Sequence, residues 1–192
     1  MSDFHAITAQ LKEKSTYEAG LVALRETVES ADQKTMVNSY KFVETVLDLL
    51  GDKDKKVQKA AEDALRTIFE KSDEWSAGYC LPMLKKGLDT KAKPQQKEVC
   101  LSIIEKFAQE HQKGIAREID WLCHPIVFLM NDIKASVKKA AKSCMAAIVA
   151  CSGNKDLEPF QPVVIKANEA LKNVPGCVEE LAGCIFVQNV EA

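Results

Sequence analysis

The chain has 192 residues, 46% of them apolar and 28% charged, which is enough to bury a sizeable core and too apolar for a disordered protein. Lys and Arg number 26 against 28 Asp and Glu, so the net charge of −2 excludes a protein that binds polyanions through bulk charge alone. The longest uncharged apolar stretch, 121–130, is too short to span a membrane, and we expect no membrane partner.

The amino-acid usage predicts an all-α fold. Only eight Gly and six Pro occur, and the good helix formers Ala, Leu, Lys and Glu dominate. Apolar residues recur at the i, i+3, i+4, i+7 spacing of an amphipathic helix, as over 57–68 and 101–108. No segment alternates apolar and polar residues for long enough to predict a strand.

The sequence repeats itself with a period of about 40 residues, a length typical of HEAT repeats. Residues 57–68 (VQKAAEDALRTI) align with 137–148 (VKKAAKSCMAAI) at a shift of 80. Residues 96–107 hold a weaker intermediate copy, and a shift of −41 from the first segment reaches an earlier one at 16–28. Because each HEAT unit is a pair of helices, the prediction is a HEAT/ARM-type α-solenoid of about five helix pairs.

In chain order, the predicted repeat borders lie near residues 32, 73, 113 and 153, within a single HEAT-repeat domain that covers 1–192. Polar hinges separate the two helices of a repeat at 51–56 (GDKDKK), 89–94 (DTKAKP) and 131–136 (NDIKAS). Each hinge is expected to precede the second helix of its repeat.

Individual residues in these units have predicted structural roles. The N-caps of the second helices are expected at Asp52, Asp89 and Asp132. Pro94 is expected in the first turn of its helix. Prolines are expected to kink three first helices, at Pro82, Pro125 and Pro162. Close approach of paired helices is expected at Ala60, Ala61, Ala140 and Ala141.

The last third of the chain resembles a known family. Its distinctive pieces are D-x-K-x-x-V-K-x-A-A at 132–141, N-K-D-L-x-x-F-x-P at 154–162 and V-P-x-x-V-x-x-L-x-x-x-x-F-V at 174–187. These are similar to the end of the amino-terminal HEAT region of fungal-type translation elongation factor three, and to the related general-control ribosome-associated HEAT scaffold. The resemblance is colinear over about residues 40–190.

The resemblance implies a role in translation and contact with the ribosome. The full-length family members also contain two ABC ATPase cassettes. This sequence has no G-x-x-x-x-G-K-[ST] loop, so the ATPase activity is not expected of it, and the chain is either a stand-alone HEAT protein or a piece of a longer one.

Lysines in the hinges are the main candidates for partner binding. Residues 53–142 contain 18 Lys and Arg against 13 Asp and Glu, whereas both flanking regions are acidic. A row of such lysines would suit rRNA phosphates or an acidic protein surface, and the alternative is an ordinary solvated surface. The candidate residues are Lys53, Lys55, Lys56, Lys91, Lys93, Lys134, Lys138 and Lys139.

No pattern in the sequence predicts catalysis, a metal or a cofactor. The seven cysteines are an odd number without a CxxC pair, which indicates a reducing compartment and buried, small apolar roles. Cys123 beside His124 has no acidic or second His partner at helical spacing, so a nucleophile is not expected there. Trp75 and Trp121 are interpreted as core or ridge residues; an exposed Trp75 would instead be a protein-binding anchor.

The sequence therefore predicts a non-catalytic, cytoplasmic and monomeric HEAT scaffold. Its expected partners are protein and rRNA of the ribosome, with no small-molecule substrate. The alternative is a module that resembles tubulin-binding TOG domains, which also bind through hinge loops. The Trp that marks the first hinge of that family is missing around residues 14–16.

Overall fold

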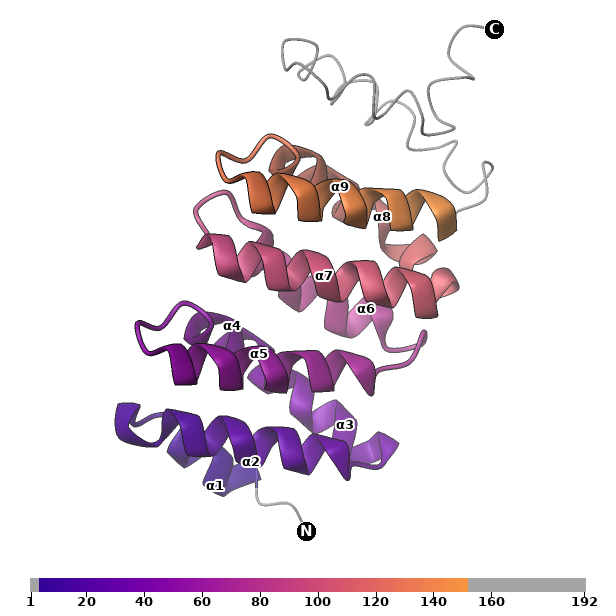
Figure 1. Cartoon of the computed structure of the whole chain (residues 1–192). Coiled ribbons are helices and arrows are strands. Elements are labelled where there is room, and N and C mark those ends of the chain that lie inside the picture. The colour runs from indigo at the N-terminus through magenta and orange to yellow at the C-terminus, as the bar shows by residue number, and fades with distance from the viewer. Residues whose placement is uncertain (1–3, 152–192) are drawn as a thin grey trace, which may run out of the picture. The chain divides into compact units, whose positions relative to one another are not determined.

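The computed structural model describes residues 4–151, and every regular element among them is a helix (Figure 1). The all-α prediction is confirmed over this part of the chain. The chain falls into two compact units, which divide between Gly87 and Leu88 and are described separately.

The first unit contains two helix pairs and the beginning of a third. In the first pair, α1 (Phe4–Gln10) and the 3-10 turn η1 (Lys14–Thr16) precede α2 (Tyr17–Glu29). In the next pair, the broken first helix consists of α3 (Gln33–Ser39), η2 (Tyr40–Phe42) and α4 (Val43–Leu49), and the second helix is α5 (Lys55–Glu70). The beginning of the third pair is α6 (Ala77–Cys80) with the 3-10 helix η3 (Leu81–Leu88).

Packing in the first unit is dominated by the second helices, α2 and α5, which lie side by side (Figure 1). Leu21 and Leu24 of α2 and Leu65 and Ile68 of α5 are fully buried. The backbone of α2 also comes close to α1, since a Cβ at Gly20 would lie only 3.0 Å from the Cβ of Gln10. Glycine at this position therefore permits the first helix pair to close.

The second unit contains α7 (Pro94–Glu110), α8 (Gln112–Leu129) and α9 (Ala135–Cys151). Two side-chain hydrogen bonds join α9 to α7: the Ser136 hydroxyl donates to Glu98 at 2.6 Å, and the Ser143 hydroxyl donates to Glu105 at 2.6 Å. In both pairs the partners are 38 residues apart, so the two helices run parallel with a fixed register.

The repeat found in the sequence is reproduced in the burial pattern of α5 and α9. Residues that align at the shift of 80 are buried in both helices, namely Val57 and Val137, Ala61 and Ala141, Leu65 and Met145, and Ile68 and Ile148. Ala60 and Ala140 are only half-buried, so the close helix contact falls on Ala61 and Ala141 and not on all four alanines.

The predicted helix caps are wrong. The N-cap of α5 is Asp54, whose carboxylate accepts from the Lys56 N–H at 2.8 Å, and Lys93 precedes α7. Each aspartate expected as a cap lies earlier in its hinge, and its carboxylate accepts a hydrogen bond from the backbone N–H two residues later. Asp forms this kind of short local turn readily. These turns join Asp52 to Asp54 at 2.8 Å, Asp89 to Lys91 at 2.7 Å, and Asp132 to Lys134 at 2.9 Å.

The prolines behave in three ways. Pro94 is the first residue of α7, as predicted, and Pro125 lies inside α8. Pro82 lies in the 3-10 helix η3 and not inside an α-helix, because proline lacks an N–H donor and disfavours the α conformation of the preceding residue. Pro162, the border near 153 and the fifth helix pair lie outside the described residues.

The contact at Ala61 gives a test of this packing. Ala61→Leu should lower the free energy of unfolding by about 1–3 kcal/mol, because added atoms in a tightly packed interface force the helices apart. Ala60→Leu adds the same atoms at a half-buried site, and its effect should stay below about 1 kcal/mol. Urea denaturation of both variants measures the difference, and an equal loss in the two would contradict the assignment.

Candidate functional site

The hinge of the first unit presents three exposed lysines, Lys53, Lys55 and Lys56, at the amino end of α5. Its two carboxylates are bound to the backbone, since Asp52 accepts from the Asp54 N–H and Asp54 accepts from the Lys56 N–H. The amide of Gln58 donates to the Asp52 carbonyl and ties the helix to the loop. The loop is thus held by local hydrogen bonds, and the lysine side chains extend from it.

The hinge at 89–94 in the second unit has the same construction. The Asp89 carboxylate accepts from the Lys91 N–H, and the Lys93 N–H donates to the side chain of Gln96 at 2.9 Å. Lys91 and Lys93 are both exposed beside the first turn of α7.

A buried ion pair connects this hinge with the one at 131–136. The Lys97 ammonium is 2.7 Å from Asp132 and donates to the Thr90 carbonyl at 2.8 Å. The side chains of Lys97 and Asp132 are only 6% and 12% exposed. The hydrogen bond from Lys97 holds the pKa of Asp132 below its ordinary value. The two hinges of the second unit therefore lie side by side.

The structure brings the predicted lysines together within each unit. Lys91 and Lys93 lie in the hinge joined through Lys97 to the hinge that carries Lys134. Lys134 and Lys139 are exposed, whereas Lys138 is half-buried and contributes to lowering the pKa of Asp132. Their role in binding stays a prediction.

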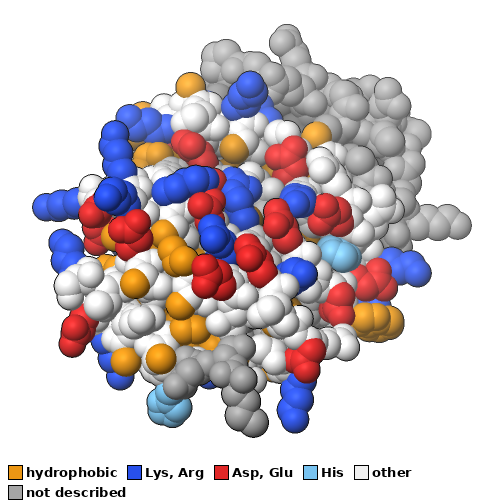
Figure 2. Space-filling model, turned by 60° about the horizontal axis from the view of Figure 1, so that its bottom comes forward, with side chains coloured by type: hydrophobic (Ala, Val, Ile, Leu, Met, Phe, Trp, Pro, Cys, Tyr) orange, Lys and Arg blue, Asp and Glu red, His pale blue; other side chains and the backbone are white. Residues whose placement is uncertain are grey.

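Most of the hinge lysines differ from several other lysines in their ion pairing. Lys59 pairs with Asp63 at 2.8 Å, Lys86 with Asp48 at 2.6 Å and Lys106 with Glu110 at 3.9 Å. Basic and acidic side chains also alternate over much of the face seen in Figure 2. Among residues 4–151, no ion pair is formed by the hinge residues Lys53, Lys55, Lys56, Lys91, Lys134 and Lys139.

The ends of the second helices reinforce this positive charge. The amino end of a helix carries a partial positive charge from its unpaired N–H groups. The first turns of α5, α7 and α9 contain no acidic residue. Lysines beside these ends raise the local potential further, so the hinges are suited to anionic ligands.

Two residues were missed or interpreted differently in the sequence analysis. Lys97 was not singled out, because its burial depends on Asp132 in the next hinge, 35 residues away. Trp75 was interpreted as a packing residue, but its side chain is 74% exposed. Exposure is what the alternative interpretation, a protein-binding anchor, requires. Trp121 is half-buried, and its indole N–H donates to Glu118.

Four of the cysteines are buried in the structure. They are Cys80, Cys100, Cys123 and Cys144, and none of these four forms a disulfide. Burial raises the pKa of Cys80 to about 11 and raises the pKa of Cys100 and of Cys144 well above the ordinary thiol value, so these three thiols stay protonated and unreactive. Cys177 and Cys184 lie outside the described residues.

The described residues contain neither a metal-binding cluster nor a membrane-spanning helix. No group of three or more His, Cys, Asp or Glu in residues 4–151 is placed to hold a metal ion. No helix in that range is long and apolar enough to cross a membrane.

Comparison with known proteins places the fold in a family. The model of the EF3 N-terminal HEAT repeat matches residues 2–145. Elongation factor 3 of Phytophthora infestans is 34% identical over 146 residues, and elongation factor 3 of Zygosaccharomyces rouxii is 29% identical over 189 residues. The matches cover 76% and 97% of this chain but only 14% and 18% of those relatives.

Solved structures of designed armadillo repeat proteins have a similar fold. A designed armadillo repeat protein, YIII(Dq)4CqI, matches with a TM-score of 0.55 at 21% identity, over 85% of this chain and 69% of that one. Computationally designed armadillo repeat proteins for modular peptide recognition match with a TM-score of 0.55 at 18% identity, over 94% of this chain and 79% of that one. The predicted HEAT/ARM-type α-solenoid is confirmed.

The pair between Lys97 and Asp132 gives a test of how the two hinges are held. Asp132→Asn keeps an acceptor for the Lys134 N–H but removes the charge that faces Lys97. The free energy of unfolding at pH 7 should fall by about 1–3 kcal/mol, because a buried ammonium loses its partner. Asp89→Asn, at a carboxylate that accepts from a backbone N–H, is the matched control and should cost less.

The same pair predicts a pH dependence. Since the pKa of Asp132 is lowered on folding, its charge stabilises the folded state at pH values above the ordinary pKa of 3.8. This contribution disappears as the pH falls through the lower pKa of the folded state. Urea denaturation at several pH values should show the difference between the wild type and Asp132→Asn shrinking below pH 3.8. A difference that persists undiminished would contradict the ion pair.

Proposed function

Because the chain belongs to the family of the elongation factor 3 N-terminal HEAT repeat, we propose that it is a translation-associated scaffold that docks on the ribosome through its hinge lysines. The matched relatives are named as elongation factors, and the chain spans less than a fifth of their length. Docking is therefore proposed for this HEAT region, without an activity of its own.

The observation that supports this proposal most is the placement of exposed lysines at the amino ends of α5, α7 and α9. A lysine at such an end is repelled by the helix dipole, at a cost of about 0.3–1 kcal/mol. The five lysines of the hinges at 51–56 and 89–94 outnumber the three carboxylates there, which therefore offset only part of this repulsion. Lysines at helix amino ends do not favour folding, and binding of an anionic partner would explain why they are there.

The chemistry of the lysines favours phosphate groups of rRNA or carboxylates of a ribosomal protein. An ammonium is a compact point charge that contacts a phosphate without reading a base. Only 3 of the 26 basic residues are Arg, so bidentate recognition of bases is a minor element of the proposal. We expect affinity that depends strongly on salt and weakly on nucleotide sequence.

The remaining elements of the proposal concern organisation. We propose one HEAT-repeat domain over 1–192 that acts as a cytoplasmic monomer and catalyses no reaction. Tubulin is the alternative partner, and a shift of free tubulin on gel filtration with this chain would favour it over the ribosome.

Ribosome pelleting across a salt series tests the proposal. Lys53→Glu, Lys55→Glu and Lys56→Glu together should weaken co-sedimentation about tenfold or more and flatten the salt dependence, because three contacts with anionic groups are lost. Replacing Lys138 and Lys139 by Glu should weaken it in the same direction. Binding that is indifferent to these changes, or no binding at low salt, would contradict the proposal.

The matched control changes the same total charge elsewhere. Lys12, Lys71 and Lys85 are exposed and lie outside the three hinges and away from the amino ends of the α-helices, and Glu at all three should leave pelleting near the wild-type level. Folding is controlled separately, since Glu at Lys55 and Lys56 complements the helix dipole and should keep or raise the melting temperature. Loss of binding by a more stable variant cannot come from misfolding.

A further inference from the structure

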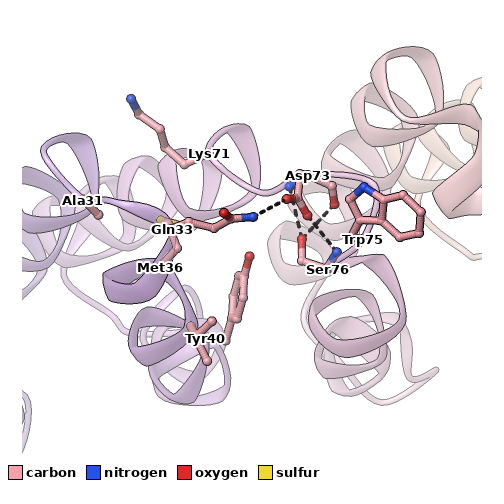
Figure 3. Close-up of a pocket in the computed structure, with 9 residues that line it drawn as sticks. Ala31, Gln33, Met36, Tyr40, Lys71, Asp73, Trp75 and Ser76 are labelled. Carbon is pink, nitrogen blue, oxygen red and sulfur yellow. Dashed lines mark hydrogen bonds between the residues drawn. The ribbon is translucent and has the colours of Figure 1, made fainter.

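A second surface lies in the first unit, at the carboxyl end of α5. A pocket of about 410 Å³ is formed there by α3 and by the loop that leads from α5 to α6. Figure 3 shows its parts: Gln33 and Asp73 bridge the top, Tyr40 lies below them and Trp75 lies beyond Asp73. The other lining residues on which the argument depends are Met36, Val37 and Ser76.

The loop at 73–76 is held in one conformation. The Asp73 carboxylate accepts from the Ser76 N–H at 2.8 Å, and the Ser76 hydroxyl donates to the Asp73 carbonyl at 2.8 Å. Gln33 donates to the other carboxylate oxygen at 3.1 Å, which ties α3 to the loop. Below them the Tyr40 hydroxyl donates to Ser72 at 3.0 Å. The pocket is therefore preformed by hydrogen bonds within the unit.

Large apolar side chains are exposed around this pocket. Trp75 is 74% exposed, Val37 59% and Tyr79 55%. Tyr79 borders the pocket, since its ring centroid is 5.6 Å from that of Tyr40. The apolar surface thus extends from the pocket onto its rim, which suits a ligand longer than the pocket itself.

The charges near the pocket favour a basic ligand. Two charged residues line the pocket, Asp73 and Lys71. Burial by itself would raise the pKa of Asp73, but hydrogen bonds from Ser76, Gln33 and the Trp75 backbone N–H lower it, so its carboxylate is charged at neutral pH. The Lys71 side chain extends away from Asp73 in Figure 3.

We propose that this pocket binds a peptide segment of a partner protein that presents an arginine next to an apolar residue. The apolar side chain packs against Met36, Val37 and Tyr40. The guanidinium stacks on the Trp75 ring and donates to the Asp73 carboxylate two residues away, a combination that a planar cation can make with an aromatic ring and an acid together. The proposal is independent of ribosome docking, because the pocket and Lys55 lie at opposite ends of α5.

An NMR titration of the full chain labelled with 15N tests the proposal. The probe is the peptide acetyl-Gly-Leu-Arg-Gly-amide, and the comparison is the same peptide with citrulline, which has the shape of arginine without its charge. We expect saturable shifts of the Trp75 indole N–H and of the Gln33 and Ser76 amide signals with the arginine peptide. The citrulline peptide should bind with an affinity at least about fivefold weaker.

Variants separate the contacts. Trp75→Ala and Asp73→Asn should each weaken binding about fivefold or more. Asn keeps an acceptor for Ser76, and the melting temperature shows whether the loop survives. Phe128→Ala, at an aromatic side chain 61% exposed in the second unit, is the matched control and should bind normally, as should Glu at Lys53, Lys55 and Lys56.

Three results would overturn the proposal. The first is equal binding of the citrulline peptide, which would leave no role for the guanidinium. The second is an unstructured RNA oligonucleotide that shifts the Trp75 and Gln33 signals when the arginine peptide does not, which would make the surface a nucleic-acid site. The third is the absence of shifts at Trp75 with the arginine peptide at millimolar concentration.

Discussion

Each of the two units depends on packing between its own two second helices. A pair of helices cannot bury its own apolar face, so α2 needs α5 and α7 needs α9. Small side chains allow these contacts: Ala61 and Ala141 are fully buried in equivalent positions, and Gly20 permits the close approach of α1. Since helix faces provide the stability, the chemistry at the helix ends is less constrained by folding and can serve binding.

The two ends of α5 illustrate this separation. Its 16 residues place the ends about 24 Å apart. At the amino end, lysines extend from a loop whose carboxylates are bound to the backbone. At the carboxyl end, Asp73, Tyr40 and the exposed Trp75 form a pocket with acidic and aromatic character. The two surfaces proposed to bind partners of opposite charge therefore lie at opposite ends of one helix.

The sequence predicted what depends on periodicity and missed what depends on contacts between repeats. The shift of 80 anticipated the equivalent burial of Val57 and Val137, because a helix face is fixed by local spacing. The positions of the caps were wrong, since Asp52 and Asp132 both precede and shape a turn, and only the backbone path decides which residue starts the helix. The exposure of Trp75 depends equally on packing that no local pattern reveals.

Lysine residues of identical chemistry have different roles according to the carboxylates around them. Lys97 and Lys134 lie near the same aspartate, yet Asp132 pairs with the Lys97 ammonium and accepts only the backbone N–H of Lys134. The Asp132 carboxylate thus pairs with Lys97 in the interior. The exposed ammonium of Lys134 forms no ion pair among residues 4–151. The same interaction fixes the loop that carries Lys134, so less conformational entropy would be lost on binding of the proposed anionic partner. The ion pair between Lys97 and Asp132 therefore holds the loop that carries Lys134 as well as joining two repeats.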